Sequence, residues 1–150
     1  MTSPTEVFDR LLEIALLLQE DMARSFRGTA LTAARTHVLW ELNRLGPSTQ
    51  QSLAVALAVS PRNITGLVDA LAASSYVERR PHPTDRRAVL VTLSDLGTET
   101  VTGMVRDREE AANQLTADFD PSRLEQFRHD LDHIADRLRV MVEGDTGGTD

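Results

Sequence analysis

Four arginines lie in one short polar segment near the middle of the chain. Arg79 and Arg80 precede a Pro-rich turn, and Arg86 and Arg87 follow Asp85 on its far side. A guanidinium carries five N–H donors in a planar fork that matches phosphate oxygens, and arginine also suits narrow minor grooves of DNA. We therefore expect this segment to bind a polyanion. A solvated basic turn without a partner is the alternative, and for Arg79 and Arg80 a plain strand-edge charge is equally compatible with the sequence.

A second polar set lies upstream, at the start of an apolar-striped segment. Ser60, Arg62, Asn63 and Thr65 surround the first turn of the helix expected from Pro61. Arginine can donate two parallel hydrogen bonds to guanine, and asparagine can pair with adenine. These four residues are thus candidates for contacts to base edges in a major groove, whereas simple helix capping by Ser60 and Asn63 is the alternative.

No catalytic set emerges from the remaining polar residues. The chain has no cysteine and no lysine, and we find no Ser–His–acid spacing typical of nucleophilic catalysis. We expect no enzyme activity, no catalytic residue and no cofactor. His129 and His133 lie one helical turn apart, but no third ligand follows at a clear spacing, so we predict no metal site. A metal-responsive protein using these two histidines remains an alternative.

The arginine-rich turn lies between two strand-like runs, 76–80 and 88–93. Val89, Val91 and Leu93 alternate with Ala88, Leu90 and Thr92 in the second run, which is the period of a half-buried strand. This predicts a β-hairpin with arginines at its tip. We expect Asp85 to be structural there, by holding the loop or by pairing an arginine.

Two short helices joined by a tight turn are predicted just before the hairpin. Ser48 and Gln51 fit a capping box that opens the first of these helices. Ser60 is the expected cap of the second, with Pro61 at its first position, and a buried stripe follows from Ile64. This arrangement is typical of a helix-turn-helix.

Longer helices are predicted on both sides of this region. We expect helices over 5–26 and 32–45 before it, and after it a helix from the Ser94 cap to about 118 and a last helix from Asp120-Pro121. Apolar residues of the last helix recur at steps of three and four, the pattern of a helix that packs lengthwise on partners. They include Leu124, Phe127, Leu131, Ile134 and Leu138. The tail, residues 144–150, is expected to be disordered.

Charge is divided unevenly along the chain, whose net charge is -7. Residues 50–94 hold 5 arginines against 3 acidic residues, whereas residues 95–150 hold 14 acidic residues against 6 arginines. A basic middle on an acidic scaffold is compatible with nucleic-acid binding. An acidic protein as partner of the basic face, in a winged-helix interaction module, is the rival interpretation. No stretch is apolar enough for a membrane span, and we expect a cytoplasmic protein with no membrane partner.

Two sequence motifs give the chain a resemblance to the MarR (multiple antibiotic resistance regulator) family of bacterial transcription factors. T-D-R-R-A-V-L-V-T-L-S-D-L-G, residues 84–97, is similar to the family's wing and its exit. L-A-V-A-L-A-V-S-P-R-N-I-T-G-L-V-D-A-L, residues 53–71, is similar to its helix-turn-helix. One departure is Ser75, where the family usually has glycine at the end of the recognition helix.

The resemblance implies a mainly α fold with a small β-hairpin wing, in one winged-helix domain over 1–150. A DNA-binding lobe would span about 32–95, and helices in 1–28 and 96–143 would join two copies into a homodimer. We expect Leu11 and Leu18 to take part in dimerisation with the five apolar residues of the last helix.

The resemblance also implies a partner and a mode of regulation. The partner would be double-stranded DNA carrying an inverted-repeat operator, with Arg87 in the minor groove. Members are mostly repressors that release DNA when a small aromatic ligand binds. His37 and Trp40 are candidate residues of such an effector pocket, although core or dimer packing is the more common role of such residues.

Overall fold

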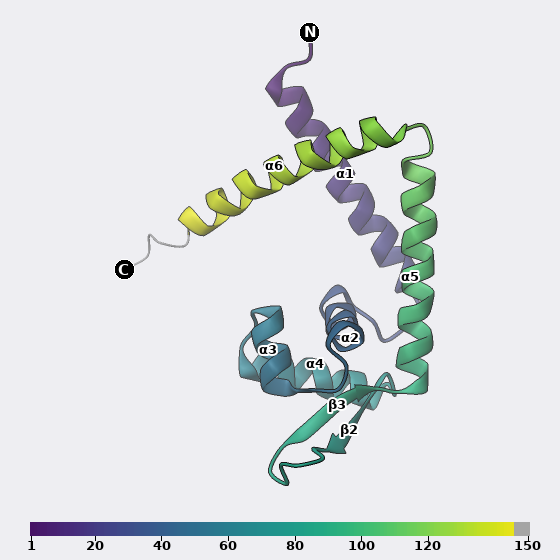
Figure 1. Ribbon diagram of the computed structural model, residues 1–150, viewed down its shortest axis with the longest axis vertical. Coiled ribbons are helices and arrows are strands. Elements are labelled where there is room, and N and C mark those ends of the chain that lie inside the picture. Colours follow the sequence, from purple (N-terminus) through teal and green to yellow (C-terminus); the bar gives the residue numbers. More distant parts are fainter. Residues whose placement is uncertain (146–150) are drawn as a thin grey trace. The chain divides into compact units, whose positions relative to one another are not determined.

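The computed structural model describes residues 1–145 and divides into two compact units, Met1–Met104 and Val105–Asp150. Helices dominate, with one small antiparallel sheet (Figure 1). In chain order the elements are α1 (Pro4–Ser25), α2 (Ala33–Leu45), β1 (Ser48–Thr49), α3 (Gln50–Leu57), α4 (Pro61–Ala73), β2 (Val77–Pro81), β3 (Val89–Leu93), α5 (Asp95–Leu115) and α6 (Pro121–Asp145). No helix in the described part of the chain combines the length and the apolar character that a membrane crossing requires.

The hydrophobic core of the first unit lies among α2, α3, α4 and β3. Its largest fully buried side chains are Leu39, Leu42, Leu53, Ile64, Leu71, Val38, Val68, Val91 and Val101. Burying a Val, Leu or Ile side chain contributes about 1.5–3 kcal/mol each, so these helices are held together mainly by apolar contact. The predicted stripe beginning at Ile64 is the buried face of α4.

The start of α3 differs from the sequence prediction. Thr49, not Ser48, is the N-cap, and its hydroxyl accepts the backbone N–H of Ser52. Ser48 instead lies in β1, where it pairs with Val91 of β3, and its hydroxyl donates to the Gly46 carbonyl at 2.8 Å. The predicted capping box of Ser48 and Gln51 is therefore wrong, because the extended backbone of Ser48 is used by the sheet.

The predicted turn between α3 and α4 is present. Ala58 ends α3 in a left-handed conformation at φ 51, and Ser60 caps α4 by accepting the Asn63 N–H. Pro61 occupies the first helical position, where its missing N–H costs nothing. Beyond α4, Ser75 has a φ of 64. The chain thus places serine in the left-handed region that glycine fills at lower cost.

The predicted hairpin is present, with both strands beginning one residue later than expected. β2 pairs with β3 from Val77↔Leu93 to Pro81↔Val89, and β1 forms the third strand in the order β1-β3-β2. Val91 is fully buried, whereas Val89 near the tip is 49% exposed. The end of the hairpin therefore extends away from the core, as Figure 1 shows below α4.

α5 begins in close contact with the two residues that precede β2. The Ser94 hydroxyl donates to the Ser75 carbonyl at 2.6 Å and accepts the Gly97 N–H at 3.0 Å. A Cβ added at Gly97 would lie 2.1 Å from the Tyr76 carbonyl oxygen. Only glycine allows this approach, which explains the glycine of the S-D-L-G motif.

α1 exposes most of its apolar side chains in the single chain. The helix has no buried residue, and Leu11 is only half-buried. Its exposed large apolar residues are Val7, Phe8, Leu12, Ile14, Leu16, Leu17, Leu18 and Met22.

α6 shows the same property in the second unit. Leu124, Phe127, Leu131 and Leu138 are exposed, and Ile134 is half-buried. Asp120 caps this helix, and the hydrogen bond from the Arg123 backbone N–H lowers the pKa of its carboxyl. The helix continues through Asp145 despite Gly144. Residues 144 and 145, which were expected to belong to the disordered tail, are therefore helical. Residues 146–150 of the expected tail lie outside the described residues.

Candidate nucleic-acid interface

The first turn of α4 presents polar side chains to solvent. Ser60, Arg62, Asn63 and Thr65 are all exposed. Ser60 Oγ accepts the Asn63 backbone N–H at 3.1 Å, which leaves the Asn63 side-chain amide outside the cap. Within the described residues, the Arg62 guanidinium forms no hydrogen bond or ion pair. Its donors are therefore available to a partner molecule.

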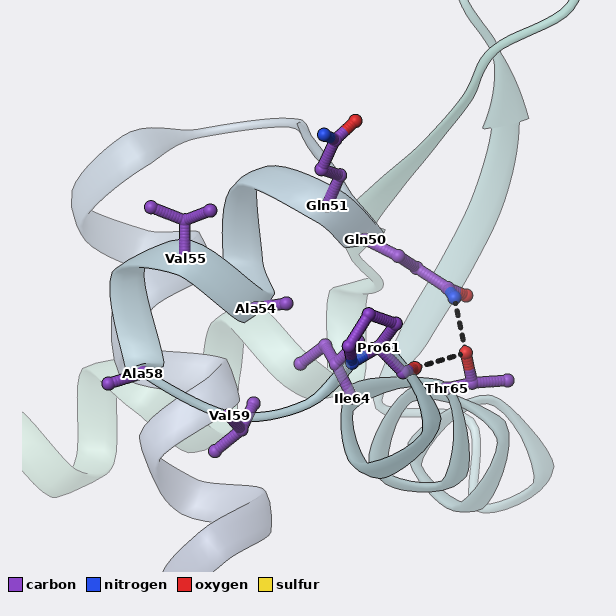
Figure 2. A pocket seen from close by; sticks show the side chains of 9 residues that line it. All are labelled: Gln50, Gln51, Ala54, Val55, Ala58, Val59, Pro61, Ile64 and Thr65. Carbon is purple, nitrogen blue, oxygen red and sulfur yellow. Dashed lines mark hydrogen bonds between the residues drawn. The ribbon is translucent and has the colours of Figure 1, made fainter.

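Thr65 is joined to the start of α3 by a hydrogen bond. Its hydroxyl donates to the Pro61 carbonyl at 2.8 Å and accepts the side-chain N–H of Gln50 at 3.0 Å. Figure 2 shows both bonds at one end of a groove whose apolar lining includes Ala54, Val59 and Ile64. This groove follows the seam between α3 and α4. Thr65 therefore contributes to fixing the two helices against each other, in addition to its exposed position.

The base of the hairpin is tied to the same two helices through Arg79. One guanidinium nitrogen of Arg79 donates both to the Asp69 carboxylate on α4 and to Gln50 Oε1, the latter at 3.1 Å. Gln50 thus links β2 to Thr65 on α4. Because both partners engage this nitrogen, Arg79 is held as a connector between the hairpin and the helix-turn-helix. Neighbouring Arg80 is paired with Glu78 at 2.9 Å.

The hairpin tip has an ordered hydrogen-bonded turn. His82 Nδ1 accepts the backbone N–H groups of Thr84 and Asp85 at 3.2 and 3.1 Å. Asp85 Oδ1 in turn accepts the backbone N–H of Arg87 at 2.9 Å, and its carbonyl accepts the N–H of Ala88 at 3.1 Å. Asp85 therefore holds the loop through backbone groups, one of the two roles expected for it.

The five arginines of this region fall into two groups. Arg79 and Arg80 have carboxylate partners, whereas the guanidinium groups of Arg62, Arg86 and Arg87 have none among residues 1–145. All three of the latter are exposed. An unpaired cation on a surface is free to bind a phosphate or a base without first breaking an ion pair. Three such cations lie on the two elements that the sequence identified, the start of α4 and the hairpin tip.

The other site residues predicted from the sequence lie on α2 and α6, outside the start of α4 and the hairpin tip. His37 is exposed and Trp40 half-buried on α2, and they are three residues apart on one helix. His129 and His133 are exposed on α6. Across residues 1–145, no group of three or more His, Cys, Asp or Glu residues could hold a metal ion.

Two residues of the interface were not identified from the sequence. Gln50 connects α3, α4 and β2, and His82 caps the turn at the hairpin tip. Both act through residues brought together by the tertiary fold or by the turn, so periodicity carries no signal for them. A histidine between two prolines in a tight turn is the one local hint for His82.

Comparison with known proteins shows relatives over most of the chain. The sequence profile of the MarR family matches residues 31–89. Mb0904, an uncharacterized HTH-type transcriptional regulator of Mycobacterium bovis, is 31% identical over 113 residues, covering 75% of this chain and 76% of the relative. The transcriptional activatory protein BadR of Rhodopseudomonas palustris is 26% identical over 155 residues, covering 99% and 87%. The HTH-type transcriptional repressor NicR of Pseudomonas putida is 37% identical over 75 residues, covering 50% and 48%.

A solved structure gives the same fold over nearly the whole chain. Streptococcus pneumoniae FabT, in a crystal structure in complex with DNA, has a TM-score of 0.82 and covers 93% of this chain and 99% of its own. The sequences are 15% identical, so the likeness is one of fold. That fold is a winged helix, in which the β2–β3 hairpin is the wing.

Proposed function

This chain belongs to the MarR family of transcriptional regulators, and from that premise we propose that two copies bind an inverted-repeat operator as a homodimer. The first turn of α4 enters the major groove, and the wing reaches the adjacent minor groove. The observation that carries the proposal is the set of unpaired guanidinium groups on Arg62, Arg86 and Arg87. Arg79 and Arg80 have carboxylate partners. They add positive electrostatic potential at the hairpin base and contact phosphates to a smaller extent.

Each candidate residue has a distinct task in this arrangement. Arg62 and Asn63 contact base edges, and Ser60 contacts a phosphate near the helix start. Thr65, whose hydroxyl proton is already donated within α4, offers its methyl group to a base edge. Arg87 enters the minor groove, and Arg86 contacts the flanking backbone. Asp85 keeps the tip in shape without touching DNA, since a carboxylate there would be repelled by phosphates.

The dimer forms through the terminal helices, in residues 1–28 and 96–143, while residues 32–95 make the DNA-binding lobe. Support comes from the eight large apolar side chains that α1 exposes and from the exposed apolar row of α6. Apolar surface of this extent on an isolated chain marks a protein contact. The residues expected to meet the partner subunit are Leu11, Leu18, Leu124, Phe127, Leu131, Ile134 and Leu138.

Regulation is proposed to be repression that a small aromatic effector relieves. The relative NicR is named a repressor and BadR an activatory protein, so family membership alone leaves the sign open. Trp40 and His37 would supply planar surfaces for stacking on the effector. A reporter gene under the operator decides the sign: repression predicts higher expression after deletion of the regulator, and lower expression contradicts it.

Selection of bound duplexes from a random library, combined with light scattering, tests the proposal. We expect enrichment of an inverted repeat with half-sites about one helical turn apart, and a mass of two protomers both free and on DNA. Affinity should fall steeply with salt, because phosphate contacts release counterions. A monomeric protein, or a library with no enriched sequence, would contradict the proposal. Tight binding to an acidic protein surface with no duplex preference would instead support the interaction-module alternative.

A further inference from the structure

His82 occupies a central position in the wing tip. It directly follows β2, is half-buried, and its backbone N–H donates to the Ala88 carbonyl across the turn at 3.1 Å. Its Nδ1 accepts two backbone N–H groups, those of Thr84 and Asp85, and the Thr84 hydroxyl lies 3.4 Å from the same atom. A single imidazole nitrogen therefore holds the first half of the turn.

This geometry determines the protonation state of the imidazole. Nδ1 can accept an N–H only through its lone pair, so its proton must be on Nε2 and the ring must be neutral. In the imidazolium form Nδ1 is a donor and faces two other donors. Protonation thus replaces two hydrogen bonds with a repulsive contact.

The bonds continue from His82 to Arg87, and Arg86 lies between the two residues that they fix. His82 fixes the backbone of Asp85, whose carboxylate then fixes the backbone of Arg87. The guanidinium groups of Arg86 and Arg87 have no ion pair of their own in the described chain. Their direction consequently depends on the backbone of the turn that His82 caps.

We propose that His82 is the positioning residue of the wing: its neutral imidazole shapes the tip for DNA, and its protonation releases the tip. This inference rests on the proposed contact of the wing with DNA. The charged groups of the same turn are Asp85, Arg86 and Arg87, and on β2 Arg80 is occupied by Glu78. Among residues 1–145 none of these groups forms an ion pair with His82. The imidazole is thus a cap for backbone N–H groups and not one member of a charge pair.

The sign of the pH effect follows from two opposing terms. Protonation adds one positive charge near DNA, which favours binding. It also removes the two hydrogen bonds that fix the turn carrying Arg86 and Arg87, which disfavours binding. Because the cap fixes the turn that carries two arginines and only one charge is gained, we expect operator affinity to be lower at a pH at which the imidazole is protonated.

Operator binding by wild type and three variants of this chain tests the proposal at pH 8.0 and pH 5.5. His82→Asn keeps an acceptor at the position of Nδ1 but cannot be protonated in this range, whereas His82→Ala removes the acceptor. At pH 8.0 we expect His82→Asn to bind like wild type and His82→Ala about fivefold more weakly, the loss typical of a hydrogen bond. At pH 5.5 wild type should approach His82→Ala, while His82→Asn should hold its affinity. His129→Asn, on α6, should retain the wild-type pH response.

Equal affinities of His82→Ala and His82→Asn at pH 8.0 would overturn the proposal, as would tighter wild-type binding at pH 5.5.

A second measurement needs no DNA. Nitrogen NMR of free wild-type protein should show the Nε2–H tautomer of His82, and the Thr84 and Asp85 amide resonances should shift with the same midpoint as the imidazole. If wild type bound no duplex at any pH, the proposed function would fail. The NMR measurement would still show whether His82 Nδ1 accepts the two backbone N–H groups of the turn. An Nδ1–H tautomer would overturn the cap itself.

Discussion

At the scale of single residues, ion pairing separates arginines that the sequence presents as one cluster. Arg79 and Arg80 are adjacent to the wing, yet each guanidinium is engaged by a carboxylate. Arg62, on the recognition helix α4, and Arg87, at the wing tip, have no such partner within residues 1–145. Sequence composition predicts where positive charge gathers, but the pairing of Arg79 depends on Asp69, which only the fold brings to β2.

Replacing Arg62 by alanine tests the major-groove contact. We expect a loss of about 1–3 kcal/mol in operator binding, because a bidentate contact to a base disappears. Sequence preference should relax at one position in each half-site, which a repeat of the duplex selection with the variant would reveal. An unchanged selected sequence would place Arg62 outside the groove.

Replacing Arg87 by alanine should weaken binding to all duplexes to a similar extent. The minor-groove and phosphate environment attracts its charge, so the slope of log affinity against log salt should become shallower by about one. Arg44→Ala, on α2, is the matched control, since that guanidinium is likewise exposed, is paired with Glu41, and is assigned no DNA contact. Binding titrations over a salt series measure both, and equal slopes for wild type and Arg87→Ala would count against the wing assignment.

At the scale of elements, the sequence predicted those parts whose signals are local. The helix starts at Ser60-Pro61, Ser94 and Asp120 and the strand around Val91 are confirmed. The alternating burial expected of that strand is not observed, since Val91 and Thr92 are both buried and Val89 is exposed. β1 was missed because a two-residue strand has no periodicity, and its pairing with β3 also moved the α3 cap to Thr49. Gln50 and His82 were missed because their roles consist of contacts, not of patterns.

Gly97→Ala should destabilise the junction between the wing and α5. The new methyl group would meet the Tyr76 carbonyl at 2.1 Å, and backbone must move to relieve this. We expect a loss of about 1–3 kcal/mol in the free energy of unfolding, the range for overpacking. Gly103→Ala is the control on the same helix, because its Cβ would meet nothing within 4 Å. Urea unfolding at one fixed protein concentration compares them, and equal stability of the two variants would refute the steric explanation.

Ser75→Gly should stabilise the protein. Serine at a φ of 64 bears a steric cost that glycine avoids, so we expect a gain of about 0.5–1 kcal/mol in the free energy of unfolding. Ser74→Gly, at an ordinary φ of -96, should bring no gain. The same urea experiment measures both, and a loss of stability in Ser75→Gly would show that the serine side chain has a role beyond the backbone.

At the scale of the whole molecule, charge and apolar surface are divided between different parts of the chain. Residues 50–94 carry an excess of arginine, while residues 95–150 carry most of the acid. The basic part contains α4 and the wing, and the acidic part contains the exposed apolar row of α6. A net charge of -7 is thus compatible with a DNA-binding surface, because the acidic segments are those that the dimer proposal assigns to subunit contact.

The central claim is that α4 and the wing of two subunits enter neighbouring grooves of one duplex, and hydroxyl-radical footprinting of a selected operator tests it most directly. The account predicts two symmetric protected segments about one helical turn apart, each flanked by minor-groove protection that Arg87→Ala abolishes. A single asymmetric segment, or flanking protection that persists in Arg87→Ala, would contradict it.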